Sequence, residues 1–322
     1  MSLWKLRLSM LGTLTAIIGL STLFFTVILS LLGVFNLLTL ALIVVLLNVV
    51  QWLIAPYIIN AIYRAKEATM SEEPRLFLMV ERLSKKSGIK LPKLMIADIP
   101  IPNAFAYSSP IAGSRVAVTR GLLKSLDEEE VEAVVGHELG HLKHRDVQVM
   151  MFVSILPAVF YFIGYSMLLS SMFGRRDERG SSGGAAIIGI ASLLLYFVLT
   201  MFTLYLSRLR EYYADRHSAS IVEEGPRKLS EGLAKIVNST GRIKRSHPET
   251  RSLNSFKALF ISDPDRAETD AIAIAQSTGI AGDEKLVQEV IKSQVTAFDR
   301  FLELFSTHPN IVKRLKALQK LA

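Results

Sequence analysis

The stretch His137-Glu138-Leu139-Gly140-His141 has the pattern H-E-x-x-H. Four residues are slightly more than one helical turn, so in a helix both imidazoles project from one face and can bind a single zinc ion. Glu138 lies about 100° around such a helix from His137, close enough to reach a metal-bound water as a general base. The pattern predicts a catalytic metal site; the alternative is two surface histidines on an amphipathic helix.

The residues around this motif carry the signals of a helix. Ser125 with Glu128 three residues later predicts a capping box, and the acidic residues 127–130 favour a helix N-terminus. Lys143 and Arg145 close the last turn, where we expect His144 to interact with exposed carbonyl groups. The apolar face comprises Val131, Val134, Val135, Leu139 and Leu142.

A catalytic zinc site uses three protein ligands and a water, so a third ligand is required. The chain has no cysteine, which leaves nitrogen and oxygen donors. The candidate is Glu211, which is followed by Asp215 at i+4 and therefore lies with it on one helix face. One carboxylate can bind the metal while the other accepts the free N–H of a ligating histidine. The alternative is an exposed charge pair with Arg208 or Arg210.

Three stretches without a charged residue, 8–63, 147–174 and 180–207, are suited to lipid. The first is too long for one crossing, so we expect spans near 8–31 and 36–59. The other two predict a second pair, 147–170 and 185–207. Together they predict four transmembrane helices. A cleaved signal peptide and a buried helical hairpin are the alternatives for the first and second pairs.

Basic residues are distributed unequally beside these spans. Only Arg175, Arg176 and Arg179 lie on one side, which places both termini and the polar segments in the cytoplasm of a multi-pass inner (cell) membrane protein. The net charge of +8 is explained by anionic membrane lipid and requires no nucleic acid. The basic residues of the cytoplasmic side are Lys5, Arg7, Arg64, Lys66, Lys143, Arg145, Arg208 and Arg210.

The polar segments are expected to form one split domain that lies on a single side of the membrane. Short β-type runs at 94–98, 103–107 and 115–119 predict a small antiparallel sheet. Helices are expected to begin at Pro226 and to cover 286–305 and 311–321, with loops at 240–256 and 262–284. The resulting division is a membrane hairpin (1–63), the first part of the domain (64–146), a second hairpin (147–207) and the second part (208–322).

The order of two spans, H-E-L-G-H-L-K-H-R-D, two spans, R-E-Y-Y-A-D and S-T-H-P-N-I-V-K-R-L resembles the HtpX family of membrane-bound zinc metalloproteases. The resemblance implies that one zinc ion is bound by His137, His141 and Glu211 and that Glu138 activates water. It implies a predominantly helical α+β, zincin-like (gluzincin) domain attached to four transmembrane helices. Family members degrade misfolded or damaged membrane proteins from the cytoplasmic side.

Weaker likenesses suggest further site residues. Related CAAX prenyl proteases end similarly, which implies that His308 hydrogen-bonds the developing oxyanion and that Arg314 pairs with a site carboxylate; alternatively His308 and Pro309 only cap the last helix. Asp146 and Asp215 are expected to support the ligands. An N-A-F-A strand, formed by Asn103, Ala104, Phe105 and Ala106, is expected to bind an extended substrate, although Tyr107-Ser108-Ser109 replaces the family's usual Thr-Gly.

Two other functions remain open at this level. One is a CAAX-type prenyl protease, for which four spans leave little room for a lipid-accessible chamber. The other is a catalytically silent membrane scaffold for quality-control partners, against which the complete ligand set argues. The sequence leaves the oligomeric state open.

Overall fold

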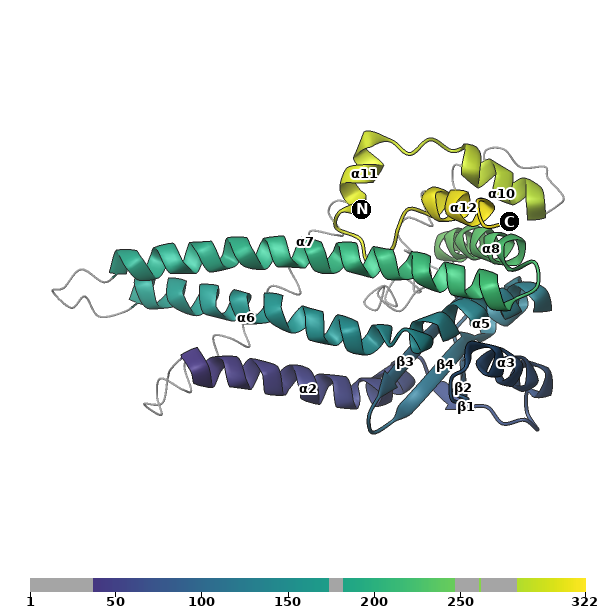
Figure 1. Cartoon of the computed structure of the whole chain (residues 1–322), viewed down its shortest axis with the longest axis horizontal. Coiled ribbons are helices and arrows are strands. Elements are labelled where there is room, and N and C mark those ends of the chain that lie inside the picture. The colour runs from purple at the N-terminus through teal and green to yellow at the C-terminus, as the bar shows by residue number, and fades with distance from the viewer. Residues whose placement is uncertain (1–36, 174–181, 247–260, 262–282) are drawn as a thin grey trace. The chain divides into compact units, whose positions relative to one another are not determined.

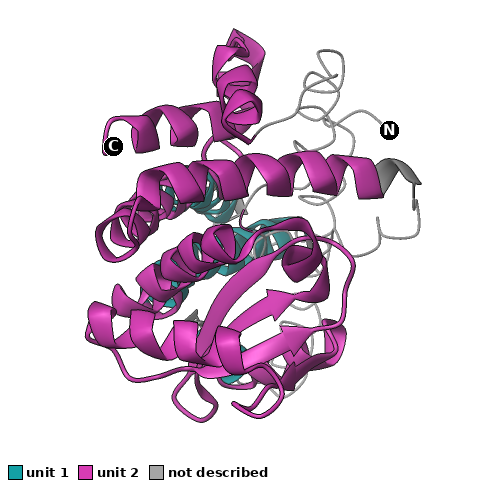
Figure 2. Cartoon of the chain, turned by 90° about the vertical axis from the view of Figure 1, so that its right-hand side faces the viewer, with its two compact units in different colours: residues 1–52, 149–203 teal, residues 53–148, 204–322 magenta. Residues whose placement is uncertain are grey.

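The computed structural model describes residues 37–173, 182–246, 261 and 283–322 (Figure 1). The predicted span 8–31 and the basic residues 175, 176 and 179 lie outside this range. The chain divides into two compact units, residues 1–52 with 149–203 and residues 53–148 with 204–322 (Figure 2). The elements are α2 (Leu37–Ile62), β1 (Ala65–Glu67), α3 (Pro74–Ser87), β2 (Lys93–Ala97), β3 (Ala104–Ser109), β4 (Gly113–Thr119), α4 (Arg120–Ser125), α5 (Glu128–Lys143), α6 (Asp146–Phe173), α7 (Ser182–Ile221), α8 (Gly225–Ser246), α10 (Asp283–Lys292), α11 (Ala297–Glu303) and α12 (Ile311–Gln319).

Three of the described helices are long and apolar enough to cross a membrane, namely Leu42–Ile62, Asp146–Met172 and Gly184–Ile221. They coincide with three of the four predicted spans. Many of their large apolar side chains are exposed, which suits lipid and disfavours the alternative of a hairpin buried in a water-soluble domain. Among these side chains are Leu42, Leu46, Phe152, Leu156, Ile187, Leu194 and Phe197.

Within the first unit, two glycines allow α6 and α7 to approach closely. A Cβ atom at Gly164 would lie 2.9 Å from the carbonyl oxygen of Gly189, and one at Gly189 would lie 3.0 Å from the carbonyl oxygen of Gly164. Side chains at either position would force the backbones apart. Small residues commonly mediate such contacts between transmembrane helices, because packing rather than the hydrophobic effect holds these helices together in lipid.

The second unit contains a four-stranded sheet in the order β1-β2-β4-β3. β1 pairs antiparallel with β2, and β3 pairs antiparallel with β4, with Ala106 opposite Val116. β2 and β4 pair in parallel, so the expected purely antiparallel sheet is wrong in one of its three pairings. β3 and β4 form a hairpin whose second strand inserts next to β2, which leaves β3 at the sheet edge.

α5 lies between the sheet and α8, as its contacts with β3, β4 and α8 and the view in Figure 2 indicate. One apolar core joins these layers and continues to α12 through Val134, Leu139, Leu233 and Leu315, all of which are completely buried. The motif helix is therefore fixed from both sides, which lets its buried polar face hold a defined geometry.

Three helix boundaries differ from the sequence predictions. The capping box is formed by Asp127 and Glu130 rather than by Ser125 and Glu128, because Ser125 is the last residue of α4. The predicted helix 286–305 is broken into α10 and α11, since Thr296 caps a new helix start. α8 continues to Ser246, so the predicted loop 240–256 begins later. The parts 247–256 and 262–282 lie outside the described residues.

Candidate metal centre

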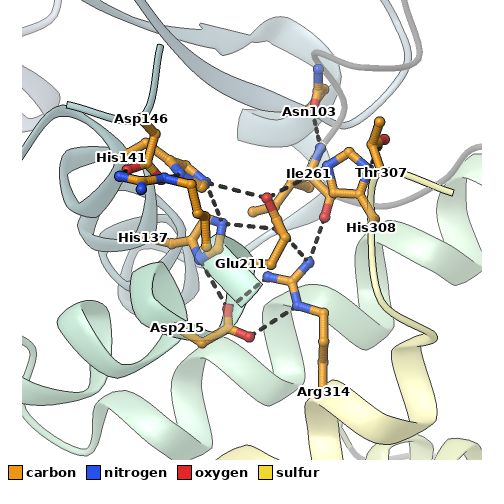
Figure 3. Close-up of polar contacts among 11 residues, drawn as sticks. Asn103, His137, His141, Asp146, Glu211, Asp215, Ile261, Thr307, His308 and Arg314 are labelled. Atoms are coloured by element: carbon orange, nitrogen blue, oxygen red, sulfur yellow. Dashed lines mark hydrogen bonds and ion pairs between the residues drawn. The ribbon is translucent and has the colours of Figure 1, made fainter. Parts of the chain in front are cut away.

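The two motif histidines lie on α5 and face a common point. Their Nε2 atoms are 3.2 Å apart, and both rings turn toward α7 (Figure 3). Glu211 of α7 completes a triangle, with one carboxylate oxygen 3.6 Å from His137 Nε2 and the other 3.5 Å from His141 Nε2. The three predicted ligands are thus brought together from segments about 70 residues apart in the sequence.

Two glycines of α5 make this approach possible. A Cβ atom at Gly140 would lie 3.0 Å from Ala214 Cα, and one at Gly136 would lie 3.1 Å from Ser218 Oγ. The hydroxyl of Ser218 donates to the carbonyl of Ala133, which ties α7 to α5 one turn further on. Gly136 directly precedes the motif and Gly140 occupies one of its variable positions, so the H-E-x-x-H pattern itself does not reveal their role.

The other nitrogen of each histidine contacts a carboxylate. His137 Nδ1 lies 2.9 Å from Asp215, and His141 Nδ1 lies 2.7 Å from Asp146. Carboxylates that accept the Nδ1 protons favour the tautomer with a lone pair on Nε2. The two Nε2 atoms then present lone pairs to each other, an arrangement that a cation stabilises and a hydrogen bond does not.

Each supporting carboxylate is in turn held by an arginine. Arg314 donates two hydrogen bonds to Asp215, of 3.0 and 2.6 Å, and also lies 3.1 Å from Glu211. Arg210 pairs with Asp146 and donates a 2.8 Å hydrogen bond to the carbonyl of His144. Arg314 therefore pairs with site carboxylates, as expected, and these are Asp215 and Glu211. Arg210 supports the site through Asp146 and does not pair with Glu211, the partner that the sequence suggests for it.

The alternative of an exposed charge pair at Glu211 is wrong. Glu211 and Asp215 are buried, and the two arginines that would pair with them point elsewhere. Arg210 pairs with Asp146, while Arg208 donates to the carbonyls of Glu303 and Ser306, each at 2.8 Å.

The electrostatics of the cluster favour a divalent cation. Burial opposes protonation of His137, but the hydrogen bonds that its imidazole donates to the carboxylates of Asp215 and Glu211 outweigh it and raise its pKa to about 9. Burial likewise opposes protonation of His141, and the contact with Asp146 raises its pKa. The local field therefore attracts positive charge. Four carboxylates face two guanidinium groups here, which leaves two negative charges: Glu138, Asp146, Glu211 and Asp215 against Arg210 and Arg314.

The spacing of the donors also fits a metal. Zinc–ligand distances of about 2.0–2.2 Å at tetrahedral angles place ligand atoms about 3.3–3.6 Å apart. The two Nε2 atoms are 3.2 Å apart, and they lie 3.6 and 3.5 Å from the two different carboxylate oxygens of Glu211, which are spacings close to these values. Glu138 belongs to the same cluster, since it offers an oxygen within 4.8 Å of nitrogens of both histidines. Burial raises the pKa of Glu138, as suits a group that exchanges protons near neutral pH.

His308 lies on the opposite side of Glu211 from the motif. Its Nε2 is 3.7 Å from Glu211, and its Nδ1 is 3.0 Å from the hydroxyl of Thr307. The alternative that His308 and Pro309 cap the last helix is not what the structure shows. Asn310 is the N-cap of α12, and its side chain accepts a 2.8 Å hydrogen bond from Val312 N–H.

The N-A-F-A strand is placed at the sheet edge, but its first side chain is not available to a substrate. Asn103 is completely buried and accepts a 3.0 Å hydrogen bond from the N–H of Ile261, whose carbonyl accepts one from Arg314. Asn103 therefore supports the arginine that holds Asp215. Of the strand residues 104–106, only Ala106 is partly exposed.

Two further histidines of the described residues, His144 and His217, lie outside the ligand cluster. His144 is the C-cap of α5, as expected. His217 contacts Ser87 Oγ at 2.9 Å and lies edge-on to the ring of His144. His247 lies outside the described residues.

Comparison with known proteins agrees with this geometry. Residues 70–322 match the family described as Peptidase family M48. The chain belongs to peptidase family M48. Within M48 it is an HtpX-type protein. It is 37% identical to the Protease HtpX homolog of Thermoplasma acidophilum, over 86% of this chain and 83% of that one. It is 40% identical to the Protease HtpX homolog of Aeropyrum pernix, over 88% and 86%.

A solved structure shares the fold of this M48 chain. The crystal structure of Ste24p from S. mikatae aligns with a TM-score of 0.57 over 98% of this chain and 66% of that one. The sequences are only 16% identical, so the likeness concerns the fold alone. It agrees with a zincin-like membrane protease that is mainly helical and has a small mixed sheet.

Proposed function

We propose that this HtpX-type M48 protein is a zinc endopeptidase that degrades misfolded or damaged membrane proteins from the cytoplasmic side of the cell membrane. The observation that carries the proposal is the buried cluster of His137, His141 and Glu211, in which both Nε2 atoms lie within 3.6 Å of a Glu211 oxygen and 3.2 Å from each other, spacings close to those of a zinc site. Glu138 lies beside it with a raised pKa. A metal site with three protein ligands and an adjacent carboxylate has the composition of a hydrolytic centre.

The proposed mechanism assigns one role to each side chain. A bound zinc ion would supply Lewis acidity toward the scissile carbonyl and would lower the pKa of a nearby water. Glu138 takes the proton of the attacking water and delivers it to the leaving amine. His308 donates a hydrogen bond to the oxygen on which negative charge develops, an interaction worth about 3–4 kcal/mol in comparable sites.

The supporting residues keep the ligand atoms in place. Asp215 and Asp146 hold the Nδ1 atoms of the two histidines, so both Nε2 lone pairs stay directed at the same point. Arg314 joins Asp215 to Glu211 and fixes the third ligand relative to the first. Because the ligand side chains are already fixed in position, they need to reorganise little during the reaction.

The proposed substrates are extended segments of membrane proteins. β3 is an edge strand, and the backbone N–H of Ala106 donates a hydrogen bond to the carboxylate of Glu138. A substrate strand pairing there would bring its backbone next to the general base, and it would be read mainly through main-chain hydrogen bonds. Because enzyme and substrate share one membrane surface, their effective concentration is raised.

The proposed orientation of the protein in the membrane rests on the basic residues beside its spans. Arg208 and Arg210 follow the charge-free stretch of α7 directly, and Lys143 and Arg145 precede that of α6. An excess of basic residues next to spans favours the cytoplasmic side, and anionic lipid is the partner that such residues fit. We therefore propose that the second unit, which carries the site, is cytoplasmic.

The function is tested by cleavage of an unfolded reporter, such as casein, and of a destabilised membrane protein by the full chain in lipid. Activity should be lost on chelation, restored by zinc, and abolished in Glu138→Gln. The matched control is Glu129→Gln on the same helix, whose side chain is 64% exposed and lies away from the site. Activity that survives in Glu138→Gln would contradict the proposal.

Two rival functions are separated by the same assay. A prenylated peptide ending in a CAAX sequence, cleaved in preference to the unfolded reporters, would indicate a prenyl protease. A protein that binds no zinc and cleaves nothing after zinc addition would indicate a catalytically silent scaffold.

A further inference from the structure

The short helix α11 exposes an apolar side. Phe298 is 59% exposed, Phe301 is 46% exposed and Leu304, just after the helix, is 49% exposed. Leu302 and Glu303 of the same helix are buried. The helix has a defined start, because Thr296 and Asp299 form a capping box. Two aromatic side chains on a stable turn are thus presented outward rather than packed into the core.

Hydrogen bonds fix the end of α11 to a particular level of α7. The guanidinium of Arg208 donates to the carbonyls of Glu303 and Ser306 at 2.8 Å and lies 3.3 Å from that of Leu304. Arg208 is the first charged residue after the charge-free stretch 180–207. A buried arginine that follows such a stretch marks the position at which the helix leaves the hydrocarbon. The end of α11 is therefore held beside this position of α7 (Figure 1).

A second feature marks the same level. Tyr205 lies one turn before Arg208, is 54% exposed, and has the Arg208 guanidinium 5.8 Å from its ring centre. Exposed tyrosines are enriched where transmembrane helices cross the interface between hydrocarbon and water. Arg208 therefore contacts both the carbonyl groups at the end of α11 and the ring of Tyr205.

The size of the apolar side distinguishes between occupants. α11 is about 10 Å long. Its three half-exposed side chains present on the order of 300 Å² of apolar surface, well below the roughly 800 Å² per partner of a stable protein interface. A patch of this size is too small for a second copy of the chain or another protein to bind on its own. It suits insertion into the boundary between headgroups and acyl chains, which requires only a few large apolar side chains.

We propose that α11 is an interfacial helix whose Phe298, Phe301 and Leu304 side chains insert into the bilayer that contains the transmembrane helices. The lipid-contacting helix α11 is followed closely by His308, and Arg208 holds the residues 303–306 that connect them. The membrane would support the position of His308 from outside the protein.

The absence of cysteine gives a direct test. A single cysteine introduced by Phe298→Cys, Phe301→Cys or Leu304→Cys carries one fluorophore at one known position of the full chain. Glu129→Cys is the control, since residue 129 lies on α5, outside the apolar side of α11, and its side chain is 64% exposed. Each labelled protein is reconstituted into phosphatidylcholine–phosphatidylglycerol vesicles with or without nitroxide-labelled lipid, and aqueous iodide is the second quencher.

Nitroxide lipid should lower the emission at positions 298, 301 and 304 at least about twice as much as at position 129, as expected for side chains inserted about 5–10 Å into the bilayer. Iodide should show the reverse order. Equal iodide quenching at all four positions, without an effect of nitroxide lipid, would overturn the proposal. Protection from both quenchers at 298, 301 and 304 would also overturn it, because protein rather than lipid would then cover the helix.

Discussion

Replacing Asp215 by asparagine tests how the ligands are held. Asp215 receives two hydrogen bonds from Arg314 and contacts His137 Nδ1, and Asp215 and Arg314 are 2% and 1% exposed. Breaking a buried ion pair from one side costs about 3–5 kcal/mol. We expect Asp215→Asn to destabilise the protein by the lower end of that range, because Glu211 remains 3.1 Å from Arg314 and still compensates part of the arginine's charge. Loss of the histidine partner should also weaken metal affinity by about 10–100-fold.

The matched substitution is Asp146→Asn, which removes the corresponding partner of His141. The Asp146 side chain is only 9% exposed, but its partners His141 and Arg210 are each 17% exposed, so water can replace part of what they lose. Asp146→Asn should therefore lower metal affinity by a similar factor but should destabilise the metal-free protein less, by about 1–2 kcal/mol. The stability difference arises from burial and not from the chemistry of the contact.

The assay measures both quantities on the full chain in detergent. Competition with a chromophoric chelator gives the zinc affinity of each variant, and denaturant unfolding of the metal-free protein gives its stability. The reasoning is refuted if Asp146→Asn destabilises the metal-free protein as much as Asp215→Asn, or if Asp215→Asn leaves zinc affinity unchanged.

Three further outcomes are expected. Gly140→Ala should destabilise the protein by about 1–3 kcal/mol and weaken zinc binding, because its new Cβ would meet Ala214 Cα at 3.0 Å and separate the helices that carry the ligands; unchanged zinc affinity would argue against this. Arg208→Gln should cost about 2–4 kcal/mol and lower kcat more than it raises KM, since the carbonyls of 303–306 lose their donor and His308 its support; a change in KM alone would contradict that role. Removal of the metal with a chelator should lower the thermal unfolding temperature, and readdition of zinc should restore it, with a stabilisation that grows as the logarithm of the free zinc concentration once this exceeds Kd.

The features that the sequence predicted well are local ones. The i, i+4 spacing of His137 and His141, and of Glu211 and Asp215, fixes their shared faces once each segment is helical. Charge-free length likewise identifies the three described spans without reference to any partner. The geometry of these pairs therefore followed from helix periodicity.

The features that it missed depend on contacts between distant segments. The parallel pairing of β2 with β4 follows from the insertion of a hairpin and leaves no mark on the strand sequences themselves. The link from Asn103 through Ile261 to Arg314 spans more than 200 residues, so the N-A-F-A motif was assigned only to substrate binding. The amphipathic pattern of 286–305 does not reveal the break between α10 and α11, because the apolar pattern continues on both sides of Thr296. Threonine followed by Asp299 three residues later is nevertheless a capping signal.

The central claim is that α5 and α7 supply a shared set of metal ligands. Metal content of the purified full chain, measured by inductively coupled plasma mass spectrometry on wild type and on Glu211→Ala, tests it most directly. The account predicts about one zinc ion per wild-type chain, in keeping with a single three-ligand site, and a large loss in Glu211→Ala. Equal zinc occupancy in the two proteins would remove Glu211 from the ligand set and contradict the account.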